Sequence, residues 1–199
     1  MPATLPERIR SFIAIHVPPE LVERVVRVQK EVETKQKSNA QAVRWTRPEQ
    51  MHLTLKFLGN VPHERLSAVE TALAQAVVGS APFSLSLEAF GCFPSARNPN
   101  VFWAGLGGQV EALKQLQARI EAQTNCFASH EENRAFHPHL TIGRVKNRGP
   151  ETRRIAETLL QFRLANAGPW TVSEVTLMRS NLSPQGAIHS QLAVLKLTG

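Results

Sequence analysis

The sequence has no tyrosine, only two cysteines and no long apolar run. Cys92 and Cys126 lack the spacing of a metal site, so we expect both thiols to be reduced. No stretch approaches the roughly 20 consecutive apolar residues that a transmembrane helix needs. Residues 1–10 lack the apolar core of a signal peptide. These absences predict a cytoplasmic protein with no membrane partner.

Acidic residues are also scarce relative to basic ones. The chain has 16 Asp and Glu against 23 Lys and Arg, which gives a net charge of +7. This balance favours a polyanionic partner such as RNA, although it also occurs in proteins with no nucleic-acid role. The 199 residues, 42% of them hydrophobic, can bury a sizeable core. We expect one domain over residues 1–199 and a monomer.

Two short segments repeat one pattern, in which His-x-Thr is followed by an aliphatic residue. They are His52-Leu53-Thr54-Leu55 and His139-Leu140-Thr141-Ile142. Side chains of a β-strand alternate between its faces, so each strand would bury its two aliphatic residues and present an imidazole beside a hydroxyl. Two such strands facing one cleft would surround a small anion.

Either segment alone is compatible with an ordinary solvated sheet face. Two copies in a chain with seven histidines favour a shared site instead. His137 lies two residues before His139 and raises the question of a metal site. No carboxylate or cysteine accompanies this pair, and Pro138 restricts its geometry. We therefore expect no metal and no other cofactor.

The flanks of both segments are also distinctive. Arg44-Trp45 precedes the first, Lys56-Phe57-Leu58-Gly59 follows it, and Gly143-Arg144 follows the second. The arrangement resembles the 2H phosphoesterases, and within them the LigT-like RNA 2′,3′-cyclic phosphodiesterases. The resemblance covers nearly the whole chain and includes residues 10–15, 90–94, 101–105 and 177–186; it departs from the family at residues 34–41 and at His137. It implies a bilobal α+β fold, in which two related antiparallel sheets flanked by helices enclose a central cleft.

Hydrophobic periodicity independently predicts a mixture of helices and strands. The predicted strands are 12–16, 42–45, 52–58, 83–89, 101–106, the second motif, 170–179 and 188–197. The predicted helices run from 18 to 34, from 62 onward, from 108 to 125 and from 150 to 162. Residues 35–40 are expected to form a loop, and residues 183–186 the turn of a hairpin.

The paired motifs suit the opening of a cyclic phosphodiester by water. The reaction needs a base for the water proton and an acid for the departing alkoxide, and two imidazoles can supply both without a metal. Thr54 and Thr141 would hydrogen-bond the non-bridging oxygens. Spacing does not assign the two roles. The resemblance implies that His52 donates a proton to the leaving 3′ oxygen and that His139 activates water, giving a 2′-phosphate.

Accessory contacts are predicted around this core. The resemblance places Arg144 near the phosphate, against the alternative of a solvated arginine at a strand end. Three aromatic residues could stack a base or belong to the core: Phe12, Trp45 and Phe57. Three basic residues near the first motif could steer phosphates or form a solubilising face: Arg44, Arg47 and Lys56.

These observations favour a metal-independent RNA 2′,3′-cyclic 3′-phosphodiesterase that acts on RNA ends or small cyclic nucleotides. The alternatives are an enzyme for another small cyclic phosphate, the reverse ligation of RNA ends through a 2′,5′ linkage, and a non-catalytic RNA-binding module. Binding alone has no need of two proton carriers, so the intact pairs of histidine and threonine argue against the last of these.

Overall fold

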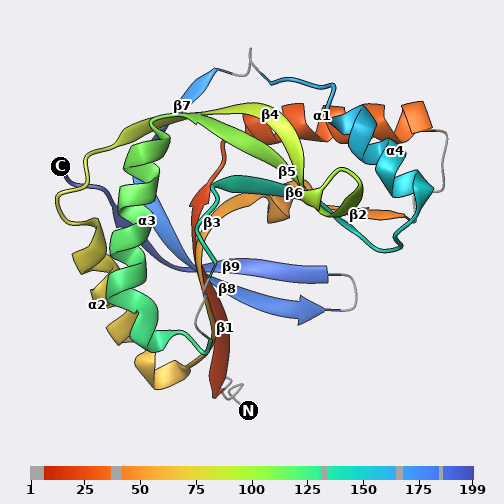
Figure 1. The fold of residues 1–199 in the computed structure, drawn as a ribbon. Coiled ribbons are helices and arrows are strands. Elements are labelled where there is room, and N and C mark those ends of the chain that lie inside the picture. The colour runs from red at the N-terminus through yellow and green to blue at the C-terminus, as the bar shows by residue number, and fades with distance from the viewer. Residues whose placement is uncertain (1–6, 37–41, 131–133, 165–167, 184–185) are drawn as a thin grey trace.

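The computed structural model describes residues 7–36, 42–130, 134–164, 168–183 and 186–199 (Figure 1). In these ranges the strands form two antiparallel sheets. One has the order β3-β1-β8-β9 and the other the order β2-β6-β5-β4-β7. The predicted loop at 35–40 and turn at 183–186 lie partly outside the described residues. The expected α+β class with two antiparallel sheets and flanking helices is confirmed.

The bounds of the elements are as follows. The first sheet contains β1 Arg8–His16, β3 His52–Pro62, β8 Glu174–Ser183 and β9 Gly186–Lys196. The second contains β2 Val43–Trp45, β4 Phe83–Ser95, β5 Asn98–Gly108, β6 His139–Val145 and β7 Pro169–Val172. The helices are α1 Pro19–Gln36, α2 Leu66–Val77, α3 Val110–Thr124 and α4 Pro150–Leu159. Short 3₁₀ turns are η1 Pro48–Gln50, η2 His63–Arg65 and η3 Asn125–Phe127.

The local sequence explains these elements. In β4 the buried Phe83, Leu85 and Leu87 alternate with half-buried serines, which is the period of a strand with one face in the core. The α4 helix begins with Pro150 in its first turn, and the Thr152 hydroxyl donates to the Gly149 carbonyl at 2.9 Å. The helix predicted from residue 62 begins instead as η2, and α2 follows at Leu66.

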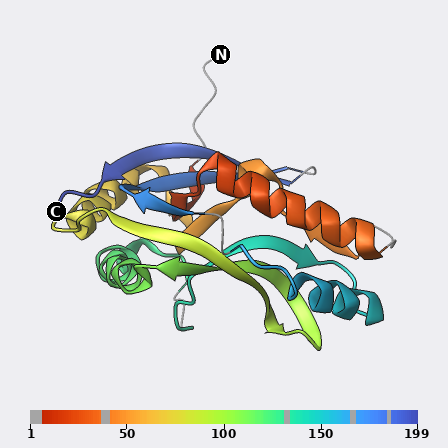
Figure 2. The same ribbon diagram turned by 90° about the horizontal axis from the view of Figure 1, so that it is seen from above.

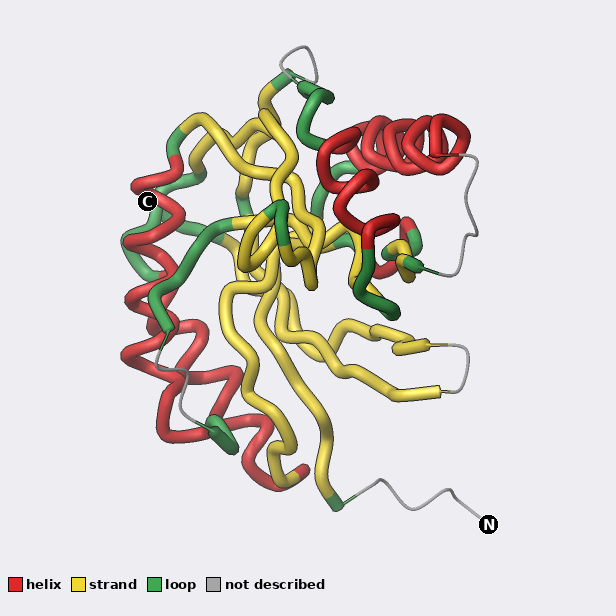
Figure 3. The backbone as a smooth tube through the Cα atoms, turned by 45° about the vertical axis from the view of Figure 1, so that its right-hand side comes forward, coloured by secondary structure: helices red, strands yellow, loops and turns green. Residues whose placement is uncertain are grey.

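The helices form two pairs that lie on separate sides of the strands (Figure 3). One pair is α2 and α3, which contact β9 and β3 of the first sheet, and the other is α1 and α4, of which α4 contacts β4 and β5. Seen from above, β8 and β9 lie on one side and β4 and β5 on the other (Figure 2). The motif strands β3 and β6 contact each other. No described helix is both long and apolar enough to cross a membrane.

Candidate active site

The aliphatic residues of both motifs anchor their strands in the core. Their exposed fractions do not exceed 3% for Leu53, Leu55, Leu140 and Ile142. The histidine and threonine of each motif are half-buried. The alternation predicted from the sequence is therefore confirmed: β3 and β6 each turn an imidazole and a hydroxyl away from the core.

Both motif strands carry a β-bulge at the same motif position. In β3, Thr54 pairs with Ala14 and Lys56 with Ile13, so Leu55 is the extra residue. A bulge shifts the alternation of all later residues by one position. Phe57, which pairs with Phe12, consequently returns to the face that carries Thr54, because β1 has no extra residue between Phe12 and Ala14.

The second bulge has the same effect on Arg144. In β6, Thr141 pairs with Trp103 and Gly143 with Phe102, so Ile142 is the extra residue. Arg144 pairs with Val101, which lies two residues from Trp103 on β5 and thus on the same face. The bulge therefore brings Arg144 to the face that carries Thr141. Arg144 and Phe57 stand at equivalent positions, five residues after each motif histidine.

A glutamine from a covering helix supports each bulge. Gln29 of α1 is buried, and its Nε2 donates to the carbonyl of Ile142 at 2.8 Å and to that of Thr46 at 3.1 Å. Gln117 of α3 donates to the carbonyl of Leu55 at 3.4 Å. Neither glutamine was predicted at the site from the sequence. The available signal was the position of Gln29 within the buried valine stripe of α1.

His52 is packed among other rings. The Phe12 ring stacks on it with a centroid distance of 4.7 Å and an interplanar angle of 27°. The His189 ring of β9 meets it edge-on at 5.2 Å and 87°. His16 lies opposite His52 in the β1–β3 register. The first motif histidine therefore packs between the Phe12 and His189 rings, with His16 opposite it on the neighbouring strand, and these contacts fix its ring orientation.

This packing disfavours a charged imidazole at position 52. Burial, with smaller contributions from the nearby His189 and His16, lowers the pKa of His52 to about 4, and a hydrogen bond to the Gln50 backbone acts in the opposite direction. Burial also lowers the pKa of His189, and the positive charge of Arg10 lowers it in the same direction. In the protein alone, His52 is consequently neutral at pH 7.

His139 is held by a hydrogen bond two residues back along the chain. Its Nδ1 lies 2.6 Å from the carbonyl oxygen of His137. A carbonyl only accepts, so Nδ1 carries the proton and Nε2 is left as an acceptor. The Phe93 ring meets His139 edge-on at 5.1 Å. Burial lowers the pKa of His139, and the charge of Arg144 acts in the same direction against the bond to His137.

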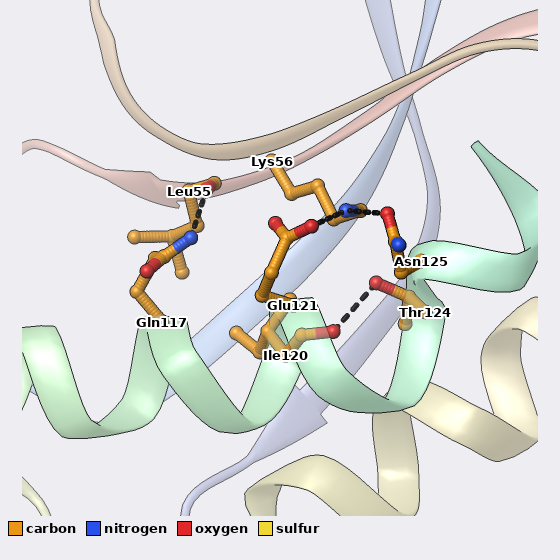
Figure 4. Close-up of polar contacts among 7 residues, drawn as sticks. All are labelled: Leu55, Lys56, Gln117, Ile120, Glu121, Thr124 and Asn125. Carbon is orange, nitrogen blue, oxygen red and sulfur yellow. Dashed lines mark hydrogen bonds and ion pairs between the residues drawn. The ribbon is translucent and has the colours of Figure 1, made fainter. Parts of the chain in front are cut away.

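Lys56 does not face the motif histidine. It lies on the opposite side of the strand, with a side chain that is 3% exposed, in an ion pair with Glu121 of α3 (Figure 4). Its Nζ also donates to the Asn125 side-chain oxygen at 3.1 Å. Lys56 thus belongs neither to a phosphate-steering surface nor to a solubilising one. It joins β3 to α3 on the side of the strand that faces away from His52.

The three candidate aromatic residues occupy different environments. Phe12 is 2% exposed and is covered by the His52 ring that it supports. Trp45 pairs with Gly143 and packs on the buried Phe102 at 5.9 Å, on the core face of its sheet. Phe57 is 59% exposed. Of these three, Phe57 has the most exposed ring, and the packing of Phe12 and Trp45 agrees with the alternative that they belong to the core.

His137 and Phe93 lie beside His139. No group of three His, Cys, Asp or Glu side chains among the described residues is placed to hold a metal ion. His137 is exposed, and its ring lies 6.3 Å from that of Phe93. Phe93, which contacts both His137 and His139, was not expected at the site.

Comparisons with known proteins find sequences similar to this chain. A sequence model of the 2′-5′ RNA ligase superfamily matches residues 12–184. Two relatives carry the name RNA 2′,3′-cyclic phosphodiesterase. The protein from Methanothermobacter thermautotrophicus is 34% identical over 96% of this chain and 100% of its own length, and the one from Archaeoglobus fulgidus is 31% identical over 94% and 100%.

Solved structures show the same fold. The crystal structure of Escherichia coli LigT in apo form matches with a TM-score of 0.77 at 25% identity, covering 98% of this chain and 100% of that one. LigT complexed with 3′-AMP matches with a TM-score of 0.73 at 26% identity, covering 97% and 100%.

Proposed function

The chain belongs to the 2′-5′ RNA ligase superfamily, and from this premise we propose that it hydrolyses RNA-terminal 2′,3′-cyclic phosphate to 2′-phosphate. The observation that carries the proposal is the pair of bulged motif strands. Each presents a histidine and a threonine on one face, and the two strands contact each other. Two proton carriers beside two hydroxyl donors match the needs of a cyclic phosphodiester that water opens.

The proposed reaction uses one histidine on each side of the phosphorus. Nε2 of His139 takes a proton from water while the water oxygen bonds to phosphorus. The bond from phosphorus to the 3′ oxygen breaks, and His52 gives its proton to that oxygen. The product carries a 2′-phosphate and a 3′-hydroxyl. The hydrogen bond from Nδ1 of His139 to the His137 carbonyl supports this assignment, since it leaves Nε2 as the base.

The low pKa of His52 means that it must gain a proton before it can act as the general acid. With a pKa of about 4, few His52 side chains are protonated at pH 7 in the protein alone. A bound phosphodiester carries a negative charge, and an opposite charge within about 4–6 Å favours the protonated imidazole. The substrate itself would therefore raise the pKa of His52, and the charged acid would form where the leaving oxygen lies.

The remaining residues have supporting roles in the proposal. Thr54 and Thr141 donate to the non-bridging oxygens of the phosphate as negative charge develops on them. Arg144 supplies a fixed positive charge from the same face as Thr141. Phe57 offers its exposed ring to a base. Ligation through a 2′,5′ linkage would use the same step with the 5′-hydroxyl of a second RNA in place of water: its oxygen bonds to phosphorus, its proton goes to His139, and the 3′ oxygen leaves with the proton of His52.

An RNA oligonucleotide with a 2′,3′-cyclic phosphate end tests the proposal. The purified protein is incubated with it in chelator, and 2′- and 3′-phosphate products are separated by phosphorus NMR. We expect 2′-phosphate alone. A 3′-phosphate product would reverse the assigned leaving group, and an unchanged substrate would rule out this activity. The same protein assayed with other cyclic phosphates and with a 5′-hydroxyl RNA tests the alternative enzymes.

A further inference from the structure

Three arginines gather beside the proposed phosphate site. Arg144 of β6 lies directly opposite Arg44 of β2 in the antiparallel register. Directly opposite residues share a face, with Cβ atoms about 4.5–5.5 Å apart. Arg44 therefore emerges on the same face as Arg144 and Thr141. Its neighbours Val43 and Trp45 point the other way, into the core side of the sheet.

The third arginine, Arg47, meets Arg44 at the turn end of the β8–β9 hairpin, where Ser183 pairs with Gly186. A Cβ atom placed on Gly186 would lie 3.2 Å from Nη2 of Arg47 and 3.4 Å from Nη2 of Arg44. The two guanidinium groups thus converge on one point. Gly186 has a φ of +124°, which suits glycine, and its missing side chain leaves room for both groups. Gln50 donates to the Ala187 carbonyl and ties η1 to the hairpin there.

The cluster carries more positive charge than its surroundings balance. Like charges directly opposite each other on neighbouring strands are destabilising. Glu49 pairs with Arg47 at 3.2 Å. Within the described part of the chain, no carboxylate lies within 4.0 Å of the Arg44 or Arg144 guanidinium. Two guanidinium groups that have no carboxylate partner among the described residues therefore lie beside Arg47, an arrangement that a bound polyanion would stabilise.

We infer that Arg44, with Arg47 beside it, binds a second backbone phosphate of the substrate, next to the cyclic phosphate near Arg144. The inference rests on the proposed function, because it takes the reacting phosphate to lie at His139 and Arg144. The fork of an arginine side chain suits a phosphate diester. A cyclic mononucleotide has no second phosphate, whereas an oligonucleotide supplies one on its 5′ side. This second contact would therefore favour RNA ends over cyclic mononucleotides.

The test distinguishes the effect of the second phosphate on kcat/KM from the effect of the second nucleoside. Two dinucleotides ending in 2′,3′-cyclic phosphate are compared, one with an ordinary internal phosphodiester and one with an uncharged methylphosphonate linkage. The wild-type protein should have a kcat/KM about tenfold higher for the charged dinucleotide, because a hydrogen bond to a charged group is worth about that factor or more. The methylphosphonate dinucleotide should behave like a cyclic mononucleotide.

Variants assign the effect to Arg44. In Arg44→Gln the ratio of the two kcat/KM values should fall toward one, and in Arg44→Lys it should fall part of the way. The slope of log(kcat/KM) against log salt for the charged dinucleotide should become shallower by about 0.7 in Arg44→Gln. Arg24→Gln, on the exposed side of α1, is the matched control and should keep both the ratio and the slope.

Two results would overturn the inference while leaving the proposed function intact. In the first, the wild-type protein hydrolyses both dinucleotides equally well, a comparison that needs no variant to fold. In the second, Arg44→Gln keeps the full preference for the charged dinucleotide. If neither dinucleotide is hydrolysed, the proposed function fails first and the second-phosphate site fails with it.

Discussion

Replacement of Gln29 by leucine should damage both stability and turnover. The change keeps the size of the side chain but removes its hydrogen bonds to the carbonyls of Ile142 and Thr46. The Ile142 carbonyl still accepts from the Thr46 amide at 2.9 Å, whereas the Thr46 carbonyl loses its side-chain donor. Each lost bond is worth about 1 kcal/mol, and a buried acceptor left without a donor costs about 1–3 kcal/mol. We expect a fall of about 2 kcal/mol in the free energy of unfolding.

Turnover should fall as well, because Gln29 supports the bulge that brings Arg144 to the face of Thr141, where we propose that the phosphate binds. Urea denaturation measures the first effect and kcat/KM on a cyclic-phosphate RNA measures the second. Gln117→Leu, which removes a single 3.4 Å bond, should lose less stability. Thr152→Val disturbs the start of α4, and should reduce stability while kcat/KM is kept. Unchanged kcat/KM in a destabilised Gln29→Leu would refute the role given to the bulge.

Three further predictions concern protonation and charge. The folded protein binds a proton at His52 less readily than the unfolded chain does, so the free energy of unfolding should fall by about 3 kcal/mol as pH drops from 6.5 to 4. Urea titrations at several pH values should show that this dependence is weaker in His52→Gln. An equal pH dependence in the variant would contradict the low pKa of His52. His189→Gln removes a side chain that lowers the pKa of His52, so this pKa should rise. The limb of the kcat/KM pH profile that requires protonated His52 should then move to higher pH. An unchanged limb would argue against an electrostatic interaction between His189 and His52. Lys56→Met should leave kcat/KM within about twofold and the free energy of unfolding within ~1 kcal/mol, because Glu121 is 35% exposed and remains solvated; a tenfold loss of turnover would show that Lys56 does reach the substrate.

The motif strands were predictable because their pattern is local. Polar and aliphatic residues alternate at His52 and Leu53, as they do in a strand with one face in the core. The burial of Leu53 and the half-burial of His52 follow directly from this alternation. The bulges were not predictable, because Leu55 and Ile142 look like ordinary buried positions. Strict alternation from His139 would put Arg144 on the wrong face. The family resemblance alone suggested its place.

Long-range contacts account for the other errors. Lys56 follows the first motif and looked like a phosphate contact, but its partner Glu121 lies 65 positions away on a helix. Gln29 reaches Ile142 across 113 positions. The low pKa of His52 depends on burial and on His189 from the last strand. No local pattern carries such information, so the identity of the site was within reach of the sequence and its electrostatics were not.

The division of labour between the two histidines has a direct test. In the substrate analogue, sulfur replaces the 3′ bridging oxygen, so that the leaving group is a thiolate with a conjugate-acid pKa near 8.5 and needs no general acid. The kcat/KM of wild type, His52→Ala and His139→Ala is measured with the oxygen and sulfur substrates. We expect sulfur to restore turnover in His52→Ala and to leave His139→Ala inactive. Restoration in His139→Ala instead would exchange the roles, and restoration in neither would contradict the acid–base pair.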